Sequence, residues 1–128
     1  MLKKIPEITA ELKKHVEEVD APFVKSHLDL KSLPFILIDV REPHEQAQGM
    51  IPGATPIPRG ILEMNIERIS QDPEKEIVCY CGGGTRSLFA AEQLQRLGYK
   101  KVKSMAGGFK AWTSAGFPVV APQRHGPQ

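Results

Sequence analysis

Strand-like apolar runs alternate with helix-like segments along most of this 128-residue chain, and this alternation is what most narrows its possible folds. Parallel strands need crossover connections, which are usually helices, whereas antiparallel strands can be joined by tight turns. The sequence therefore predicts an α/β fold, with a mostly parallel open sheet and helices on both faces. We expect strands at residues 34–40, 54–57, 76–80 and 101–105, and helices at residues 6–19, 43–48, 61–69, 85–97 and 109–115.

Length and charge fit a single domain that does not act on nucleic acid. The 17 Lys and Arg residues nearly balance the 15 Asp and Glu residues, which gives a net charge of only +2. No apolar run approaches the roughly 18 residues of a membrane span, and the first residues lack a signal peptide's apolar stretch. We therefore expect a cytoplasmic protein with no membrane partner. Its expected parts are an N-terminal helical extension packed on the domain (1–33), a core (34–119) and a flexible tail (120–128).

The two cysteines, Cys79 and Cys81, are predicted to be free thiols. Residues i and i+2 of a strand lie about 6.6 Å apart, at the outer limit for a disulfide. The chain has neither a CxxC motif nor a zinc-type Cys/His spacing, so we expect no metal site. Cys79 falls within a predicted strand and is expected to pack in the core, with a role as a resolving thiol as the alternative.

The run from Cys81 to Ser87 is the most unusual local feature of the sequence. It places a cysteine at the end of a predicted strand, then three glycines, then the start of a helix. Ligands of α/β sheets bind beyond the carboxyl ends of the strands, where Cys81 would lie. Glycines let successive N–H groups turn inward, and the helix start adds its positive end. A loop of this kind binds anions, and with Arg86 beside it we expect the loop to stabilise the thiolate form of Cys81. We therefore favour a reactive Cys81 over a buried structural thiol.

Four motifs in this order closely resemble single-domain rhodanese-type sulfurtransferases. They lie at residues 39–43 (DVREP), 49–54 (GMIPGA), 81–87 (CGGGTRS) and 107–118 (GGFKAWTSAGFP). The resemblance covers about residues 35–119 and implies a rhodanese-like fold, a parallel sheet flanked by helices. It also implies that a cysteine carries a sulfane sulfur as a persulfide between donor and acceptor, without a metal or organic cofactor.

The resemblance assigns roles to residues at matching positions. Cys81 would be the nucleophile, and Arg86 would close the loop around the bound sulfur. Asp39 and Arg41 would support the loop through ion pairs and hydrogen bonds rather than touch the substrate. The outer persulfide sulfur would be held by the backbone N–H groups of Gly82, Gly83, Gly84, Thr85, Arg86 and Ser87.

The implied activity is transfer of sulfur from a small donor to a thiol or cyanide acceptor. Thiosulfate, mercaptopyruvate and low-molecular-weight persulfides are the donors to consider, and a thioredoxin-like or sulfur-relay protein is a candidate partner. The family often has histidine where Met50 stands, and charged or bulkier residues at Gly82 and Gly83. The missing charge leaves Arg86, with Arg59 at the rim, to attract an anionic donor, so we expect thiosulfate to be a poor substrate.

Two other functions remain as alternatives. Cysteine-dependent phosphatases and arsenate reductases also use a curled loop and an arginine, but with the spacing C-x5-R. Here Cys81 and Arg86 give C-x4-R, a loop that is one residue tighter. A non-catalytic rhodanese-like module that binds a partner protein is the other alternative. Loss of the cysteine would favour such a module, and here Cys81 is present.

Overall fold

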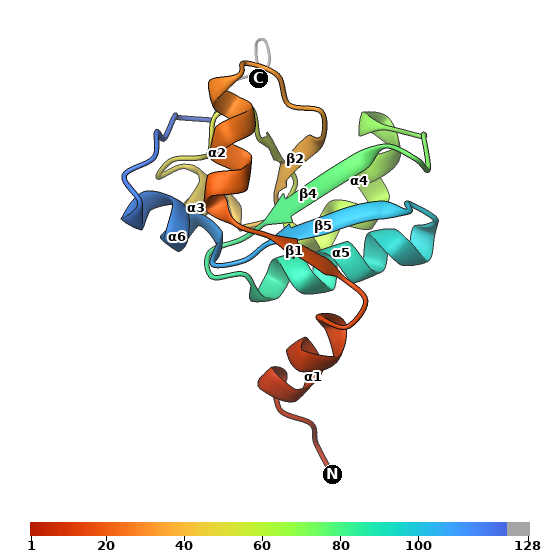
Figure 1. The fold of residues 1–128 in the computed structure, drawn as a ribbon. Helices are drawn as coiled ribbons and strands as arrows, with labels where there is room; N and C mark the ends of the chain where they lie inside the picture. Colours follow the sequence, from red (N-terminus) through yellow and green to blue (C-terminus); the bar gives the residue numbers. More distant parts are fainter. Residues whose placement is uncertain (123–128) are drawn as a thin grey trace.

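Five strands form one parallel sheet at the centre of the computed structural model, which describes residues 1–122 (Figure 1). The order across the sheet is β1-β5-β4-β2-β3, and every neighbouring pair runs parallel. The predicted α/β fold is confirmed. The strands are β1 (Glu17–Val19), β2 (Ile36–Asp39), β3 (Thr55–Pro56), β4 (Glu76–Tyr80) and β5 (Lys101–Met105).

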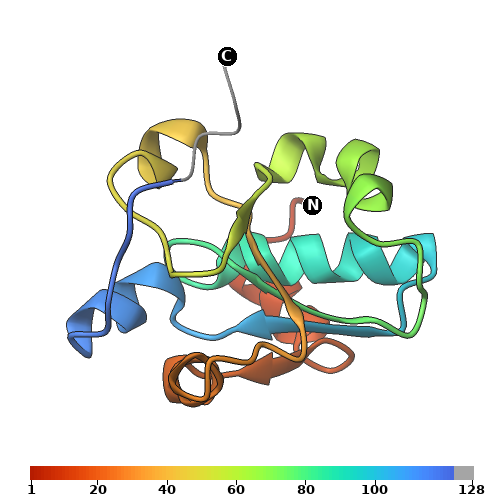
Figure 2. The same ribbon diagram turned by 90° about the horizontal axis from the view of Figure 1, so that it is seen from above.

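Helices cover both faces of the sheet and create two apolar cores. In Figure 2, α4 and α5 lie on one side of the sheet and α2 lies on the other, and Trp112 of α6 packs in the same core as Val24 of α2. Strand β4 serves both cores, because Ile77 and Cys79 face one core and Val78 and Tyr80 face the other. The helices are α1 (Ile5–Leu12), α2 (Ala21–Asp29), α3 (Pro43–Gln46), α4 (Leu62–Ile69), α5 (Thr85–Leu97) and α6 (Gly108–Ser114), with a 3-10 turn, η1 (Arg59–Ile61).

The N-terminal segment differs from its prediction. The helix expected at residues 6–19 ends at Leu12, and the chain then forms β1, in which Val19 pairs with Met105 of β5. Val16 is buried as the helical periodicity predicted, although it lies in a turn. Strand β1 takes up the hydrogen-bonding edge that β5 would otherwise expose, and this long-range pairing overrides the local helical pattern.

Helix α2 was not predicted, although its start carries a recognisable signal. Asp20 caps the helix by accepting a hydrogen bond from the N–H of Phe23 at 2.9 Å, and Pro22 follows in the first turn. Val24 of α2 is fully buried in the same core as Tyr80 of β4. The segment expected as a helical extension, residues 1–33, therefore supplies both an edge strand and a core helix.

The remaining boundaries agree well, except near the C-terminus. Strands β4 and β5 and helix α5 have their predicted bounds, whereas β3 is only two residues long. Val120, the first residue of the expected flexible tail, is held in the fold, because it exchanges two backbone hydrogen bonds with Met50, at 2.7 and 2.9 Å. Residues 123–128 of that predicted tail lie outside the described residues. Between residues 1 and 122, no helix is both long and apolar enough to cross a membrane.

Candidate active site

Cys81 follows β4 directly, at the carboxyl end of the sheet, and only 1% of its surface is exposed. The backbone N–H of Gly84 donates a hydrogen bond to the Cys81 sulfur at 3.1 Å. Gly84 has φ +103° and precedes the first residue of α5, and a Cβ there would lie 3.2 Å from the backbone nitrogen of Gly107. Glycine is therefore required at the position where the loop turns back toward the sulfur.

The start of α6 holds the backbone of the cysteine loop in place. The N–H of Phe109 donates to the carbonyl of Cys81 at 2.7 Å, and the N–H of Lys110 donates to that of Gly82 at 3.0 Å. Gly108 has φ +56°, and a Cβ there would collide with the carbonyl oxygen of Cys81. The glycine pair of the fourth sequence motif thus allows α6 to approach the loop closely.

Two buried serines extend the hydrogen bonding at the Cys81 sulfur. The hydroxyl oxygen of Ser87 lies 3.5 Å from the sulfur and 2.7 Å from the hydroxyl oxygen of Ser104. Both serines are fully buried. Sequence reasoning found Ser87 but missed Ser104, whose signal was a small polar residue on the same face of β5 as the buried Val102.

Arg86 does not stand free beside the sulfur, because it forms a bidentate ion pair with Glu45 of α3. Its two terminal nitrogens donate to the two Glu45 oxygens at 2.6 and 3.0 Å. Hydrogen bonding from Arg86 lowers the pKa of Glu45 to about 2, and the same bonds raise the pKa of Arg86. The structure thus pairs the one cation of the loop with a carboxylate that sequence reasoning did not single out.

Asp39 and Arg41 form a buried ion pair at the end of the neighbouring strand β2. An Arg41 terminal nitrogen donates to Asp39 at 2.8 Å and to the carbonyl of Gly49 at 2.6 Å. The guanidinium lies 4.1 Å from the ring centre of Phe109, whose N–H binds the Cys81 carbonyl. The predicted supporting pair therefore reaches the loop through Phe109.

Tyr80 connects the Asp39–Arg41 ion pair to the backbone of Ile51 through hydrogen bonds. The sequence did not single out Tyr80 as a site residue. Its hydroxyl donates to Asp39 at 2.7 Å and accepts a hydrogen bond from the N–H of Ile51 at 3.1 Å. Burial raises the pKa of Tyr80 above its ordinary value, so the hydroxyl keeps the proton that it donates.

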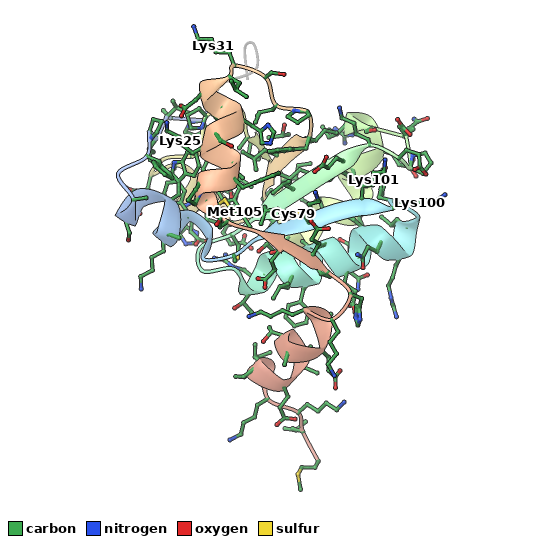
Figure 3. All side chains as sticks on the ribbon, in the orientation of Figure 1. Lys25, Lys31, Cys79, Lys100, Lys101 and Met105 are labelled. Carbon is green, nitrogen blue, oxygen red and sulfur yellow. The ribbon has the colours of Figure 1, made fainter. Side chains whose placement is uncertain are left out.

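Among the described residues, the other predicted members of the loop form no hydrogen bond with the Cys81 sulfur. Gly83 and Thr85 are exposed, and Gly82 is partly buried. Arg59, expected at the rim, forms an ion pair with Glu63 at 2.8 Å. Burial raises the pKa of the Cys79 thiol to about 12, and Cys79 lies within the sheet (Figure 3), as expected for a core residue.

Fold and site together define an α/β protein with a buried cysteine in a glycine-rich turn between a parallel strand and a helix. The family model for the Rhodanese-like domain matches residues 11–115, and the chain belongs to this family. A protein named sulfurtransferase from Allochromatium vinosum is 37% identical over 109 residues, covering 84% of this chain and 98% of that protein.

Solved structures show the same likeness. A protein of unknown function from Rhodopseudomonas palustris, described as a possible tyrosine phosphatase, has a TM-score of 0.83 and 31% identity, covering 94% of this chain and 96% of its own. A thiosulfate sulfurtransferase from Pseudomonas aeruginosa has a TM-score of 0.77 and 26% identity, covering 88% of this chain and 22% of its own. The predicted family and rhodanese-like fold are confirmed, and the comparisons support sulfur transfer in general.

Proposed function

We propose that this protein is a sulfurtransferase that carries a sulfane sulfur on Cys81 as a persulfide. The observation that carries this proposal is the setting of the Cys81 sulfur. It lies at the carboxyl edge of the sheet, 3.1 Å from the N–H of Gly84 and 3.5 Å from the hydroxyl of Ser87. A backbone N–H fixed in this position, joined by a serine hydroxyl that can turn to donate, stabilises negative charge on sulfur.

The reaction consists of two transfers. The Cys81 thiolate attacks the outer sulfur of the donor, a new S–S bond forms, and the rest of the donor leaves with the electrons of the broken bond. A thiol or cyanide acceptor then removes the outer sulfur and regenerates the thiolate. Each half-reaction moves negative charge among sulfur atoms, so oriented N–H and O–H donors can lower both barriers without a metal or organic cofactor.

We propose that the N–H groups of Gly82, Gly83, Thr85, Arg86 and Ser87 join that of Gly84 in holding the outer sulfur. The candidate donors are thiosulfate, mercaptopyruvate and low-molecular-weight persulfides, and the acceptor is cyanide, a small thiol, or a thioredoxin-like or sulfur-relay protein. The relatives' names support the sulfur chemistry. The short C-x4-R loop, in which the N–H of Gly84 lies 3.1 Å from the Cys81 sulfur, supports a single sulfur atom as the transferred group.

Intact mass spectrometry tests this function directly. The protein is incubated with thiosulfate, mercaptopyruvate and glutathione persulfide in turn, and each productive donor is expected to add one sulfur that cyanide removes. Cys81→Ser is expected to gain none. If no donor loads the wild-type protein, the non-catalytic partner-binding module becomes the better interpretation.

The second candidate function, phosphate-ester or arsenate chemistry, has one observation in its favour. The Rhodopseudomonas palustris structure, which covers almost the whole chain, is described as a possible tyrosine phosphatase. Against it stands the C-x4-R spacing of Cys81 and Arg86, one residue tighter than the C-x5-R spacing of the phosphatases.

A further inference from the structure

The cysteine loop carries one cation, Arg86, and this cation forms an ion pair with Glu45. The bidentate contact, at 2.6 and 3.0 Å, uses both terminal nitrogens of the guanidinium. Arg86 is 38% exposed and Glu45 is 28% exposed, so the pair lies at the mouth of the site rather than in the core. An incoming anion therefore meets a neutralised arginine and the Glu45 carboxylate beside it.

Gly82 makes room for this ion pair. A Cβ at Gly82 would lie 3.0 Å from a terminal nitrogen of Arg86 and 3.7 Å from a carboxylate oxygen of Glu45. The pair thus passes directly over the backbone of the loop that holds Cys81. Glu45 remains ionised under all ordinary assay conditions, because Arg86 lowers its pKa to about 2.

The other charges near the loop do not offset Glu45. Asp39 and Arg41 are buried and paired with each other at 2.8 Å. Lys110 and Glu42 are opposite in sign and exposed to solvent, which screens both of them. An anionic donor that approaches Arg86 is therefore repelled mainly by the carboxylate of Glu45.

We propose that Glu45 sets the charge class of the donor, so that the site favours monoanionic sulfane donors over dianionic thiosulfate. The inference rests on the proposed sulfurtransferase function and names its substrate class: persulfides and thiosulfonates, in which the reacting end carries a single negative charge. A unit charge about 6 Å from Glu45 changes binding by about threefold even at the dielectric constant of water, and by more in a less polar mouth. Thiosulfate carries one such charge more than the favoured donors.

Two donors of similar shape isolate the effect of charge. Thiosulfate and methanethiosulfonate present the same outer sulfur, but a methyl group replaces one oxygen of thiosulfate and removes one negative charge. In both reactions the Cys81 thiolate forms the new S–S bond and the donor's S–S bond breaks. The electron pair leaves on sulfite, a dianion, in one case and on methanesulfinate, a monoanion, in the other.

The experiment measures the rate constant for sulfur loading of Cys81 with each donor. Glu45→Gln keeps the size of the side chain and one acceptor oxygen for Arg86 but removes the charge, and Glu45→Ala also removes the remaining contact. We expect both variants to raise the ratio of the thiosulfate rate to the methanethiosulfonate rate by at least about threefold. Because each ratio is taken within one protein, any loss of folded protein affects both donors equally.

Glu67→Gln is the matched charge control. Glu67 is exposed on α4 and lines a groove with Gly98 and Tyr99, the residues before β5. That groove lies at the amino edge of the sheet, where Lys100 and Lys101 are found (Figure 3), opposite the edge that carries Cys81. The Glu67 variant is expected to keep the wild-type ratio.

The outcomes separate this inference from the function on which it rests. If the wild type loads both donors but the ratio does not rise in the Glu45 variants, the inference is wrong and the persulfide function stands. An equal rise in Glu67→Gln also overturns it, because net charge alone would then explain the result. If neither donor loads Cys81 in the wild type, the proposed function fails and the inference fails with it.

Discussion

The hydroxyl oxygens of Ser87 on α5 and Ser104 on β5 lie 2.7 Å apart in the fully buried interior, and Ser87 also contacts the Cys81 sulfur at 3.5 Å. A protonated Cys81 donates its hydrogen to Ser87. A thiolate or persulfide instead needs the hydroxyl of Ser87 as a donor, and Ser104 can then donate to the Ser87 oxygen in turn. The serine pair can thus reverse its hydrogen bonds as the charge on Cys81 changes.

Ser104→Ala is expected to slow sulfur loading of Cys81, because Ser87 loses the partner that orients its hydroxyl. We also expect the free energy of unfolding to fall by about 1 kcal/mol, the usual net value of one hydrogen bond. Single-turnover loading and urea denaturation measure the two effects. Ser114→Ala, an exposed site at the end of α6, is the matched control. Equal loading rates in wild type and Ser104→Ala would argue against this role.

Replacing the two cysteines separately is expected to give opposite results. Cys81→Ser should lose sulfur transfer and keep a cooperative thermal transition. Cys79→Ser should remain active but unfold more easily, because a hydroxyl enters a fully buried apolar position. Sulfur-transfer assays and thermal unfolding distinguish these outcomes. Comparable loss of turnover in both folded variants would instead indicate a two-cysteine redox cycle.

The fold could be predicted best where local signals mark both ends of an element. Helix α5 has a glycine at each boundary, and both Gly84 and Gly98 adopt the left-handed conformation that ends regular helix geometry. The segment at residues 6–19 lacked such marks. Val16 and Val19 continue its helical period, yet Val19 belongs to a strand because β5 has an open edge beside it. The open edge of β5 is a feature of the tertiary structure, so the local sequence carries no signal for it.

Tyr80→Phe is expected to destabilise the protein more than Tyr99→Phe. The Tyr80 hydroxyl joins Asp39 and the N–H of Ile51 in the buried interior, so its removal leaves two buried groups without that partner. We expect a loss of about 1–3 kcal/mol. The Tyr99 hydroxyl donates to the carbonyl of Ser70 in a partly exposed setting, where water can replace it. Equal denaturation midpoints for the two variants would contradict this ranking.

The Glu45–Arg86 ion pair is expected to contribute to stability above pH 4.5 and to lose this contribution as the pH falls toward 2. The folded-state pKa of Glu45, about 2, lies below its ordinary value of 4.5, so the unfolded chain binds a proton first on acidification. The difference in unfolding free energy between wild type and Glu45→Gln should therefore shrink across this range. Denaturation at a series of pH values measures it. A difference that is constant from neutral pH to pH 2 would show that the carboxylate is not held ionised by Arg86.

The site could be predicted from the sequence only where its residues are contiguous. Cys81, Gly84 and Ser87 lie in one loop and contact each other, so a motif could reveal them. Glu45 lies 41 residues before its partner Arg86 and comes beside it only because β2 is next to β4 in the sheet. Local sequence marks Glu45 only as a helix-capping residue of α3, whose side chain accepts a hydrogen bond from the N–H of Glu42 at 3.0 Å, so its pairing with Arg86 depends on the strand order.

The length of the cysteine loop is expected to select sulfur over phosphate. In the C-x4-R loop, the N–H of Gly84 reaches the Cys81 sulfur at 3.1 Å, a geometry suited to one additional sulfur atom. A tetrahedral phosphate or arsenate needs a wider ring of donors for its oxygens. The wild-type protein should therefore transfer sulfur and hydrolyse aryl phosphates negligibly. A Cys81-dependent phosphatase rate above the best sulfur-transfer rate would make the phosphatase interpretation the correct one.

Inserting one glycine after Gly83 converts the loop to C-x5-R and tests this relationship directly. Gly83 is exposed and has open space around its Cα, so the added residue can bulge outward without a clash. The insertion moves the N–H of Gly84 away from the sulfur, and a displacement of about 1 Å can lower a rate by about 100-fold. We therefore expect sulfur transfer to fall steeply while weak binding of phosphate esters appears. A glycine inserted after Gln71, in the exposed turn before β4, is the control and should leave both activities at the wild-type level, so a similar loss there would show that the insertion acts through stability rather than through the geometry of the loop.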